Sequence, residues 1–150
     1  MPDALCAKEK SLPAYEKGET MADIDDLQAA FAQVVAAINA RNLDAFSALV
    51  HDEEVFFPPD SPFPVEGKAA RQQFFRTVSA ESESVTTTPI KPQCRIIGTT
   101  GIVWSHFTFA LKPKDSAMRT FFVRSTITFA KSDGKWLMVA EHHSRLPSGN

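Results

Sequence analysis

Cysteine and glycine are scarce in this chain, and their scarcity excludes several kinds of site. The two cysteines among 150 residues are too few for a disulfide framework or for a zinc site built on cysteine. The six glycines are scattered and form no phosphate-binding loop. The sequence also has no serine nucleophile elbow and no cysteine–histidine arrangement. The common motifs for phosphate binding and nucleophilic hydrolysis are therefore absent.

Long apolar runs and concentrated positive charge are missing as well. No run approaches the roughly 20 apolar residues that span a bilayer, and the first 20 residues lack the apolar block of a signal peptide. The 16 Lys and Arg are scattered among 18 Asp and Glu, for a net charge of −2, so there is no basic stripe for nucleic acid. We therefore expect a cytoplasmic protein that binds neither membranes nor nucleic acid.

The chain does have enough apolar material for one core. Hydrophobic residues make up 43% of it, with 12 Phe, and a domain of this length buries about two-thirds of its unfolded surface. Residues 1–21 are polar and broken by Pro2 and Pro13, which predicts a flexible N-terminal extension. A single folded domain is expected over residues 22–150.

Helical periodicity comes first along this domain. An amphipathic helix is predicted from Asp23, a short one over residues 43–50, and a third over residues 67–78. The third helix is expected to bury Ala70 and Phe74. The rest of the chain then reads as strands.

Four β-rich segments follow the helices, at residues 85–97, 102–111, 119–131 and 135–144. Pro89 and Pro92 place the first of them at an edge or a bulge, because proline cannot donate to a strand ladder. Helices packed on a curved antiparallel sheet make an α+β domain.

The last strand carries the chain's most reactive side chains. It ends in Glu141, His142 and His143, and histidine is the side chain that titrates near neutral pH. Adjacent strand residues point to opposite faces, so the two histidines cannot bind one metal ion together. The charged run at residues 51–54 is interpreted as a solvated helix exit. We expect no metal site and no cofactor.

The turn between the last two strands decides which histidine faces inward. A three-residue loop over residues 132–134 pairs odd residues with odd ones, and a two-residue turn pairs odd with even. The longer loop is preferred because it packs Val139 and Leu137 in the core, with Val139 against Ile127. The shorter turn would exchange the roles of the two histidines.

With the longer loop, three polar side chains converge on the inner face of the sheet. They are Ser125, Glu141 and His143, and a carboxylate beside an imidazole can act as an acid/base pair. His142 then lies opposite Arg124 on the outer face. Glu141 and His143 are the candidate catalytic residues.

Four segments in order along residues 24–147 resemble the nuclear transport factor 2-like (NTF2-like) superfamily, particularly its SnoaL-like and calcium/calmodulin-dependent kinase II association-domain branches. They are the first helix with Leu43-Asp44-Ala45-Phe46, the exit strand from His51 to Phe57, the helix start Gly67-Lys68-Ala69-Ala70, and Asp133-Gly134-Lys135-Trp136 ending in His142-His143-Ser144. The resemblance implies a cystatin-like fold, in which three helices pack on a strongly bent sheet to form a hollow cone.

The resemblance also implies a pocket in the cone and a homodimer through the outer face of the sheet. The expected pocket-lining residues are Phe57, Phe63, Phe107, Ser125 and Ile127. The expected interface residues are Trp104, His106, Arg124, Thr126 and His142. The only tyrosine, Tyr15, lies outside the domain, so the tyrosine-dependent chemistry of the ketosteroid isomerase relatives is not expected.

Two functions are compatible with these expectations. The first is an isomerase, cyclase or hydratase that acts on a small apolar substrate through Glu141 and His143. The second is a non-catalytic association module that dimerises and whose pocket is vestigial or sequesters a small hydrophobic ligand. The size of the cavity, and whether Glu141 and His143 reach it, distinguishes the two.

Overall fold

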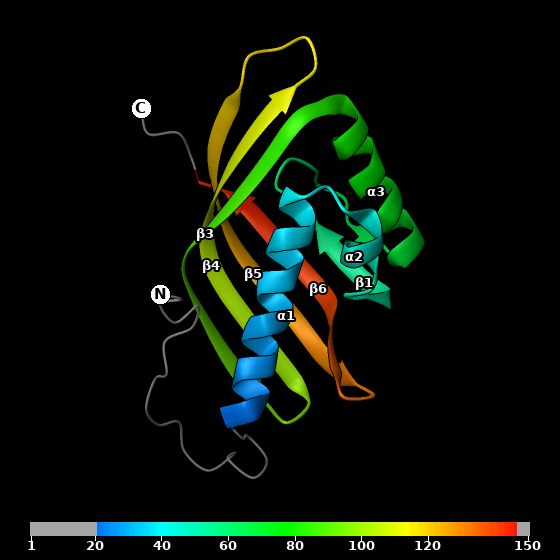
Figure 1. Ribbon diagram of the computed structural model, residues 1–150, viewed down its shortest axis with the longest axis vertical. Coiled ribbons are helices and arrows are strands. Elements are labelled where there is room, and N and C mark those ends of the chain that lie inside the picture. The colour runs from blue at the N-terminus through cyan, green and yellow to red at the C-terminus, as the bar shows by residue number, and fades with distance from the viewer. Residues whose placement is uncertain (1–20, 147–150) are drawn as a thin grey trace.

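The computed structural model describes residues 21–146, which form three helices and six strands. The helices are α1 (Met21–Asn39), α2 (Leu43–Ser47) and α3 (Lys68–Glu81). The strands are β1 (Val50–Phe57), β2 (Val65–Glu66), β3 (Ser82–Ile97), β4 (Thr100–Pro113), β5 (Arg119–Ser132) and β6 (Lys135–Arg145). All three predicted helices and all four predicted long strands are present (Figure 1).

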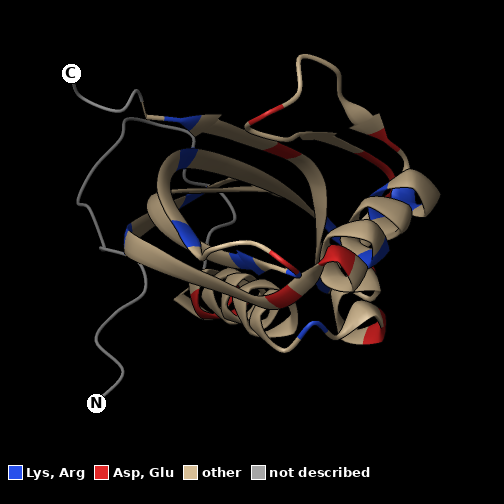
Figure 2. Ribbon diagram, turned by 90° about the horizontal axis from the view of Figure 1, so that it is seen from above, with Lys and Arg blue, Asp and Glu red and all other residues tan. Residues whose placement is uncertain are grey.

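The strands of the described residues form one sheet in the order β2-β1-β6-β5-β4-β3. Neighbouring strands are antiparallel except β1 and β6, which run parallel. The predicted antiparallel order of the four long strands is therefore confirmed. The strand β1 joins them as a parallel neighbour of β6, and no hairpin links these two strands. The sheet curls and the helices lie across its concave side (Figures 1 and 2), which confirms the α+β cone.

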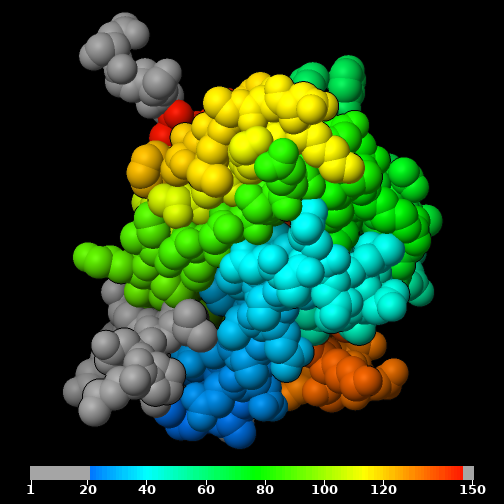
Figure 3. All heavy atoms as spheres, turned by 45° about the horizontal axis from the view of Figure 1, so that its top comes forward, coloured from blue at the N-terminus to red at the C-terminus, as the bar shows by residue number. Residues whose placement is uncertain are grey.

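α1 closes one side of the curled sheet. In Figure 3, α1 (blue) contacts both α2 (cyan) and β3 (green), and its buried residues include Leu27, Phe31 and Val34. Gly101 of β4 permits the close approach, since a Cβ there would lie 2.8 Å from two side-chain carbons of Leu27. Any larger residue at this position would force the Leu27 side chain or α1 to shift.

β3 lies at the edge of the sheet, as its prolines predicted. Its pairing with β4 shifts between Ile90 and Gln93, where Lys91 has a φ of 47° and Pro92 follows. The prediction that Pro92 marks an edge or a bulge is therefore confirmed.

Met21, which was predicted to end the N-terminal extension, is the first residue of α1. Residues 1–20 and 147–150 lie outside the described residues, so the flexible extension over residues 1–21 stays a prediction. None of the helices in the described part of the chain is long and apolar enough to cross a membrane. The cytoplasmic location also stays a prediction.

The turn between β5 and β6 has two residues rather than the predicted three. Asp133 and Gly134 have φ angles of 49° and 76°, and Ser132 pairs directly with Lys135. Positive φ at both central residues is the geometry of a type I′ turn, which suits the twist of a hairpin. Odd residues therefore pair with even ones next to the turn.

The shorter turn reverses the predicted burial at the start of β6. Trp136 and Met138 are buried, whereas Leu137 and Val139, which were predicted to enter the core, are only partly buried. The prediction failed because aspartate tolerates the left-handed conformation. Asp133 could therefore share the turn with the glycine.

A β-bulge then shifts the register within β6. Phe129 pairs with Met138, but Thr128 pairs with Ala140, so Val139 has no opposite residue between these two pairs. One extra residue on one strand reverses which face the following side chains occupy. The end of β6 therefore alternates in the opposite sense to its beginning.

This reversal restores the predicted faces of the two histidines. Ile127 pairs with Glu141 and Ser125 with His143, and these four residues lie on the inner face of the sheet. His142 lies on the outer face and is exposed. The histidines do not exchange roles, although the turn is the one that was expected to exchange them.

Candidate active site

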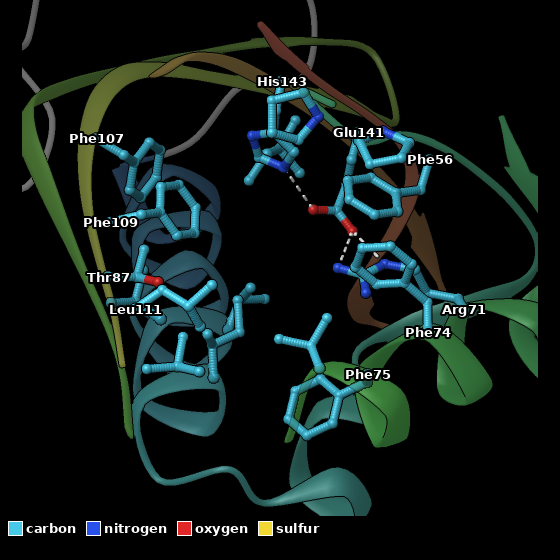
Figure 4. A pocket seen from close by; sticks show the side chains of 18 of the residues that line it. Phe56, Arg71, Phe74, Phe75, Thr87, Phe107, Phe109, Leu111, Glu141 and His143 are labelled. Carbon is cyan, nitrogen blue, oxygen red and sulfur yellow. Dashed lines mark hydrogen bonds and ion pairs between the residues drawn. The ribbon is translucent and has the colours of Figure 1, made fainter. Parts of the chain in front are cut away.

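A cavity of about 400 Å³ lies between the concave face of the sheet, α1 and α3. Its wall is largely aromatic, with contributions from Phe31, Phe56, Phe74, Phe75, Phe107, Phe109 and Phe121. Arg71, Glu141 and His143 form a polar group in this wall (Figure 4). An apolar cavity with few polar groups is the usual form of a small-molecule site.

Glu141 and His143 both reach this cavity and contact each other. His143 Nε2 is 3.1 Å from Glu141 Oε2, and the imidazole lies among the rings of Phe56, Phe107 and Phe109, with centroids 5.4, 6.5 and 6.3 Å away. His143 Nδ1 has no hydrogen-bond partner among the described residues. If Nε2 donates its proton to the carboxylate, Nδ1 is left as an acceptor.

Arg71 of α3 binds Oε1, the other carboxylate oxygen of Glu141. Arg71 was not predicted as a site residue from the sequence. Its Nε donates to Glu141 Oε1 at 3.0 Å, and its Nη2 is also 3.0 Å from that oxygen. The guanidinium also packs over the rings of Phe46 and Phe56, 4.6 and 4.1 Å from their centroids. Its charge is therefore buried with a carboxylate and aromatic faces around it.

A signal for Arg71 was present in the helical spacing. The buried face of α3 carries Arg71 and Phe75, four residues apart, whereas Ala70, which was predicted to be buried, is exposed. The predicted face was one residue out because it was built from apolar residues alone, Ala70 and Phe74 among them. Arg71 occupies a position on the buried face of α3. A charged residue at such a position would have indicated the site.

Glu54 completes the buried group, and the sequence misplaced it too. Residues 51–54 belong to β1 rather than to a helix exit, so Glu54 shares a face with Phe56 and is fully buried. Its Oε2 lies 3.7 Å from Arg71 Nε. Two carboxyl groups therefore flank one guanidinium away from solvent.

The two carboxyl groups hold different protonation states. For Glu54, burial and the neighbouring charge of Glu141 outweigh the attraction of Arg71 and raise the pKa to about 9. For Glu141, burial alone would raise the pKa, but the charge of Arg71 and the contact with His143 outweigh it and hold the pKa well below its usual range. At neutral pH, Glu54 is a neutral acid beside an ionised Glu141.

Two of the five predicted pocket residues line the cavity and three do not. Phe107 and Ile127 are part of the wall. Phe57 follows Phe56 on β1 and so points to the outer face, where it is 39% exposed. Phe63 is 74% exposed in the loop before β2. Ser125 is buried next to His143 in the ladder but does not line the cavity.

The five predicted interface residues are all exposed: Trp104, His106, Arg124, Thr126 and His142. Trp104, Thr126 and His142 form one row across β4, β5 and β6. Phe57 of β1 continues this row, with its ring stacked on His142 at 5.7 Å. The outer face of the sheet thus carries an aromatic row, and dimerisation through it stays a prediction.

The proline-rich loop after β1 is tied to the end of β6 at one edge of the cavity. Arg145 contacts Asp60 through Nε at 2.8 Å and Nη2 at 3.0 Å, and its guanidinium lies 4.3 Å from the ring centroid of Phe121. Asp60 and Phe121 both line the cavity.

Within residues 21–146, no three His, Cys, Asp or Glu side chains are grouped as ligands for a metal ion.

Comparison with solved structures identifies the same fold elsewhere. A proposed dehydratase of the NTF2-like family from Streptomyces avermitilis is 14% identical, with a TM-score of 0.79 over 86% of this chain and 100% of that one. A proposed scytalone dehydratase from Novosphingobium aromaticivorans is 11% identical, with a TM-score of 0.77 over 85% and 86%. A proposed calcium/calmodulin-dependent protein kinase II association domain from Xanthomonas campestris is 21% identical, with a TM-score of 0.72 over 95% and 97%.

At these identities the solved structures show the fold alone. No curated protein matches the chain. The model of the SnoaL-like domain family matches residues 27–148, which is most of the chain. This chain therefore belongs to the SnoaL-like domain family.

Proposed function

We propose that the cavity binds a small, largely apolar molecule and that His143, held by Glu141, moves a proton on it. The observation that carries this proposal is the Glu141–His143 contact in the wall of an aromatic cavity of about 400 Å³. The aromatic wall favours a hydrocarbon frame, and the polar group fixes its orientation. The reaction class is isomerisation, dehydration or cyclisation through proton abstraction.

Each polar residue has a separate role in this chemistry. His143 Nδ1, which has no partner among the described residues, takes a proton from a carbon next to a carbonyl group and later returns it to the ligand. Glu141 fixes the tautomer of the imidazole and stabilises the imidazolium that forms. Arg71 keeps Glu141 ionised and fixes its position from behind. Dehydratases proposed for two proteins of this fold are compatible with the same step.

Hydrogen–deuterium exchange tests this step without knowledge of the natural substrate. The probe is 2-tetralone, an apolar ketone with acidic C–H bonds, in D₂O, with exchange followed by NMR. We expect the wild-type protein to accelerate exchange by about 10²-fold or more, as a positioned general base does. His143→Gln should remove the acceleration, because the amide cannot accept the proton.

His142→Gln is the matched control for this experiment. His142 neighbours His143 in sequence but lies on the outer face, so its replacement should leave the exchange rate unchanged. If His143→Gln exchanges the probe as fast as the wild type does, the acid/base role is wrong. Equal losses in both variants would point to a general effect on folding, which would also remove the support for a specific base.

We also propose that a second copy of the chain covers the outer face of the sheet. The observation that favours this is the exposed aromatic row, in which the side chain of Trp104 is 38% exposed. Phe122, in a neighbouring part of the same face, is 51% exposed. Aromatic residues on one face are characteristic of protein interfaces, where they supply most of the binding energy. A symmetric dimer would place each row against its equivalent.

Trp104→Glu should convert such a dimer to monomers. A buried tryptophan at the centre of an interface contributes about 2 kcal/mol or more. The dissociation constant of the dimer should therefore rise at least 30-fold. Light scattering coupled to size exclusion measures the change. Met118→Glu, at an exposed position before β5, is the control. A wild-type protein that is monomeric at high micromolar concentration would contradict the proposal.

A further inference from the structure

A second polar group lies in the cavity wall, away from Glu141 and His143. Thr87 of β3 lines the cavity and is 3% exposed. Its Oγ1 is buried and has no hydrogen-bond partner among the described residues. Figure 4 shows this oxygen turned toward the interior of the cavity, across from the Glu141–His143 pair.

The hydroxyl of Thr87 is held in place without taking part in the fold. Asn39 at the end of α1 binds the backbone of Thr87 on both sides: the Thr87 N–H donates to Asn39 Oδ1 at 2.6 Å, and Asn39 Nδ2 donates to the Thr87 carbonyl at 3.0 Å. These contacts satisfy the main chain and fix its position. The side-chain hydroxyl is left over, and the fold does not use it.

An unpaired hydroxyl is unusual in these surroundings. Val35, Ile38, Val85 and Leu111 contribute to the same cavity wall, and none of them offers a hydrogen-bonding side chain. Burial of a polar group without a partner is unfavourable, whereas a partner that binds to it contributes to affinity. Valine would fill the same volume at no such cost, so the hydroxyl at this position points to a ligand group.

Phe109 connects the two polar positions. It pairs with Thr87 across β3 and β4, and its ring centroid is 6.3 Å from that of His143. A flat molecule that reaches from His143 to Thr87 would therefore cover the side chain of Phe109. Aromatic rings pack favourably in offset or edge-to-face arrangements, so this wall suits a planar frame.

We propose that Thr87 is a specificity-determining residue that binds a second polar group of the ligand. The ligand class is a flat, mainly hydrocarbon frame with hydrogen-bonding groups at two separated positions, one at Glu141–His143 and one at Thr87. This inference rests on the proposed function, because it assigns the other end of the same ligand. Ligands that carry a single polar group should therefore bind less tightly than ligands with two.

Two probes that differ by one hydroxyl test the inference: 2-naphthol and 2,6-dihydroxynaphthalene. Their dissociation constants are measured by calorimetry with the wild-type protein, Thr87→Val and Thr87→Ser. The wild type should bind the diol about tenfold more tightly than 2-naphthol, as one hydrogen bond to a buried partner provides. Thr87→Val removes the hydroxyl at nearly constant volume and should abolish this ratio. Thr87→Ser keeps the hydroxyl and should preserve it.

The melting temperature of the free protein provides a second readout. Since the Thr87 hydroxyl has no internal partner, Thr87→Val should melt at the same temperature as the wild type or higher. A clear fall would show that the hydroxyl stabilises the fold, and would overturn the inference. Unchanged diol preference in Thr87→Val, or no preference in the wild type, would also overturn it.

Failure of the inference and failure of the proposed function give different results. If both probes bind the wild type and Thr87→Val equally well, the cavity binds apolar molecules and only the role of Thr87 is wrong. If neither probe binds and 2-tetralone undergoes no accelerated exchange, the proposed function is wrong and the assignment of Thr87 fails with it.

Discussion

Arg71→Met is expected to lower the free energy of unfolding by about 3–5 kcal/mol at pH 7, which is the usual cost of leaving a buried charge without its partner. Glu141 is 2% exposed and receives two nitrogens of Arg71 at 3.0 Å. Methionine would fill much of the volume but would leave this carboxylate with His143 and Glu54 alone. Urea denaturation followed by circular dichroism measures the loss.

Arg76→Met is the matched control for Arg71→Met. Arg76 lies on the same helix and is exposed, so the change should stay within about 0.5 kcal/mol. The double variant Arg71→Met/Glu141→Gln should recover part of the loss, because the buried anion is gone. A cost below about 1 kcal/mol for Arg71→Met would show that Glu141 is not ionised in the folded protein.

Glu54→Gln is expected to stabilise the protein at alkaline pH. The pKa of Glu54 is raised from 4.5 to about 9, so between these values the folded state binds a proton that the unfolded state has released. Stability from this group is complete below pH 4.5 and is lost as the pH rises toward 9, with a slope of up to about 1.4 kcal/mol per pH unit. Glutamine resembles the protonated acid and does not titrate.

The measurement is the free energy of unfolding from pH 5 to pH 8. The wild-type value should decline relative to Glu54→Gln across this range, and the variant should be more stable by about 2 kcal/mol or more at pH 8. Glu141 adds little slope there, because its lowered pKa keeps it ionised in the folded state and its ordinary pKa of 4.5 leaves it mostly ionised in the unfolded state. Glu53→Gln, at an exposed neighbouring position, should follow the wild type. Parallel curves for wild type and Glu54→Gln would mean that Glu54 is ionised in the folded protein.

Most of the fold followed from local patterns in the sequence. The amphipathic spacing of Leu27 and Phe31 predicted α1, and Pro92 predicted the irregular edge strand; both depend on contacts between near neighbours in the chain. The parallel pairing of β1 with β6 did not follow. It depends on packing between segments about 85 residues apart, which no local pattern encodes.

The site was predicted in part, and the missing half has a common physical cause. Glu141 and His143 lie on a strand whose alternation could be read. Arg71 was not identified and Glu54 was assigned to a solvated run, because isolated charges are rarely buried. Each is buried only because the other charged groups are present. These charged groups lie on segments that are distant in sequence, so their contacts are seen only in the three-dimensional structure.

The unpaired Val139 also affects how freely this hairpin can change in length. The half of β6 before it packs against the core and the half after it presents Glu141 and His143 to the cavity. A chain without Val139 and with a turn one residue longer would keep both halves beside their present neighbours. The bulge and the turn together thus set which side chains the end of β6 presents to the cavity.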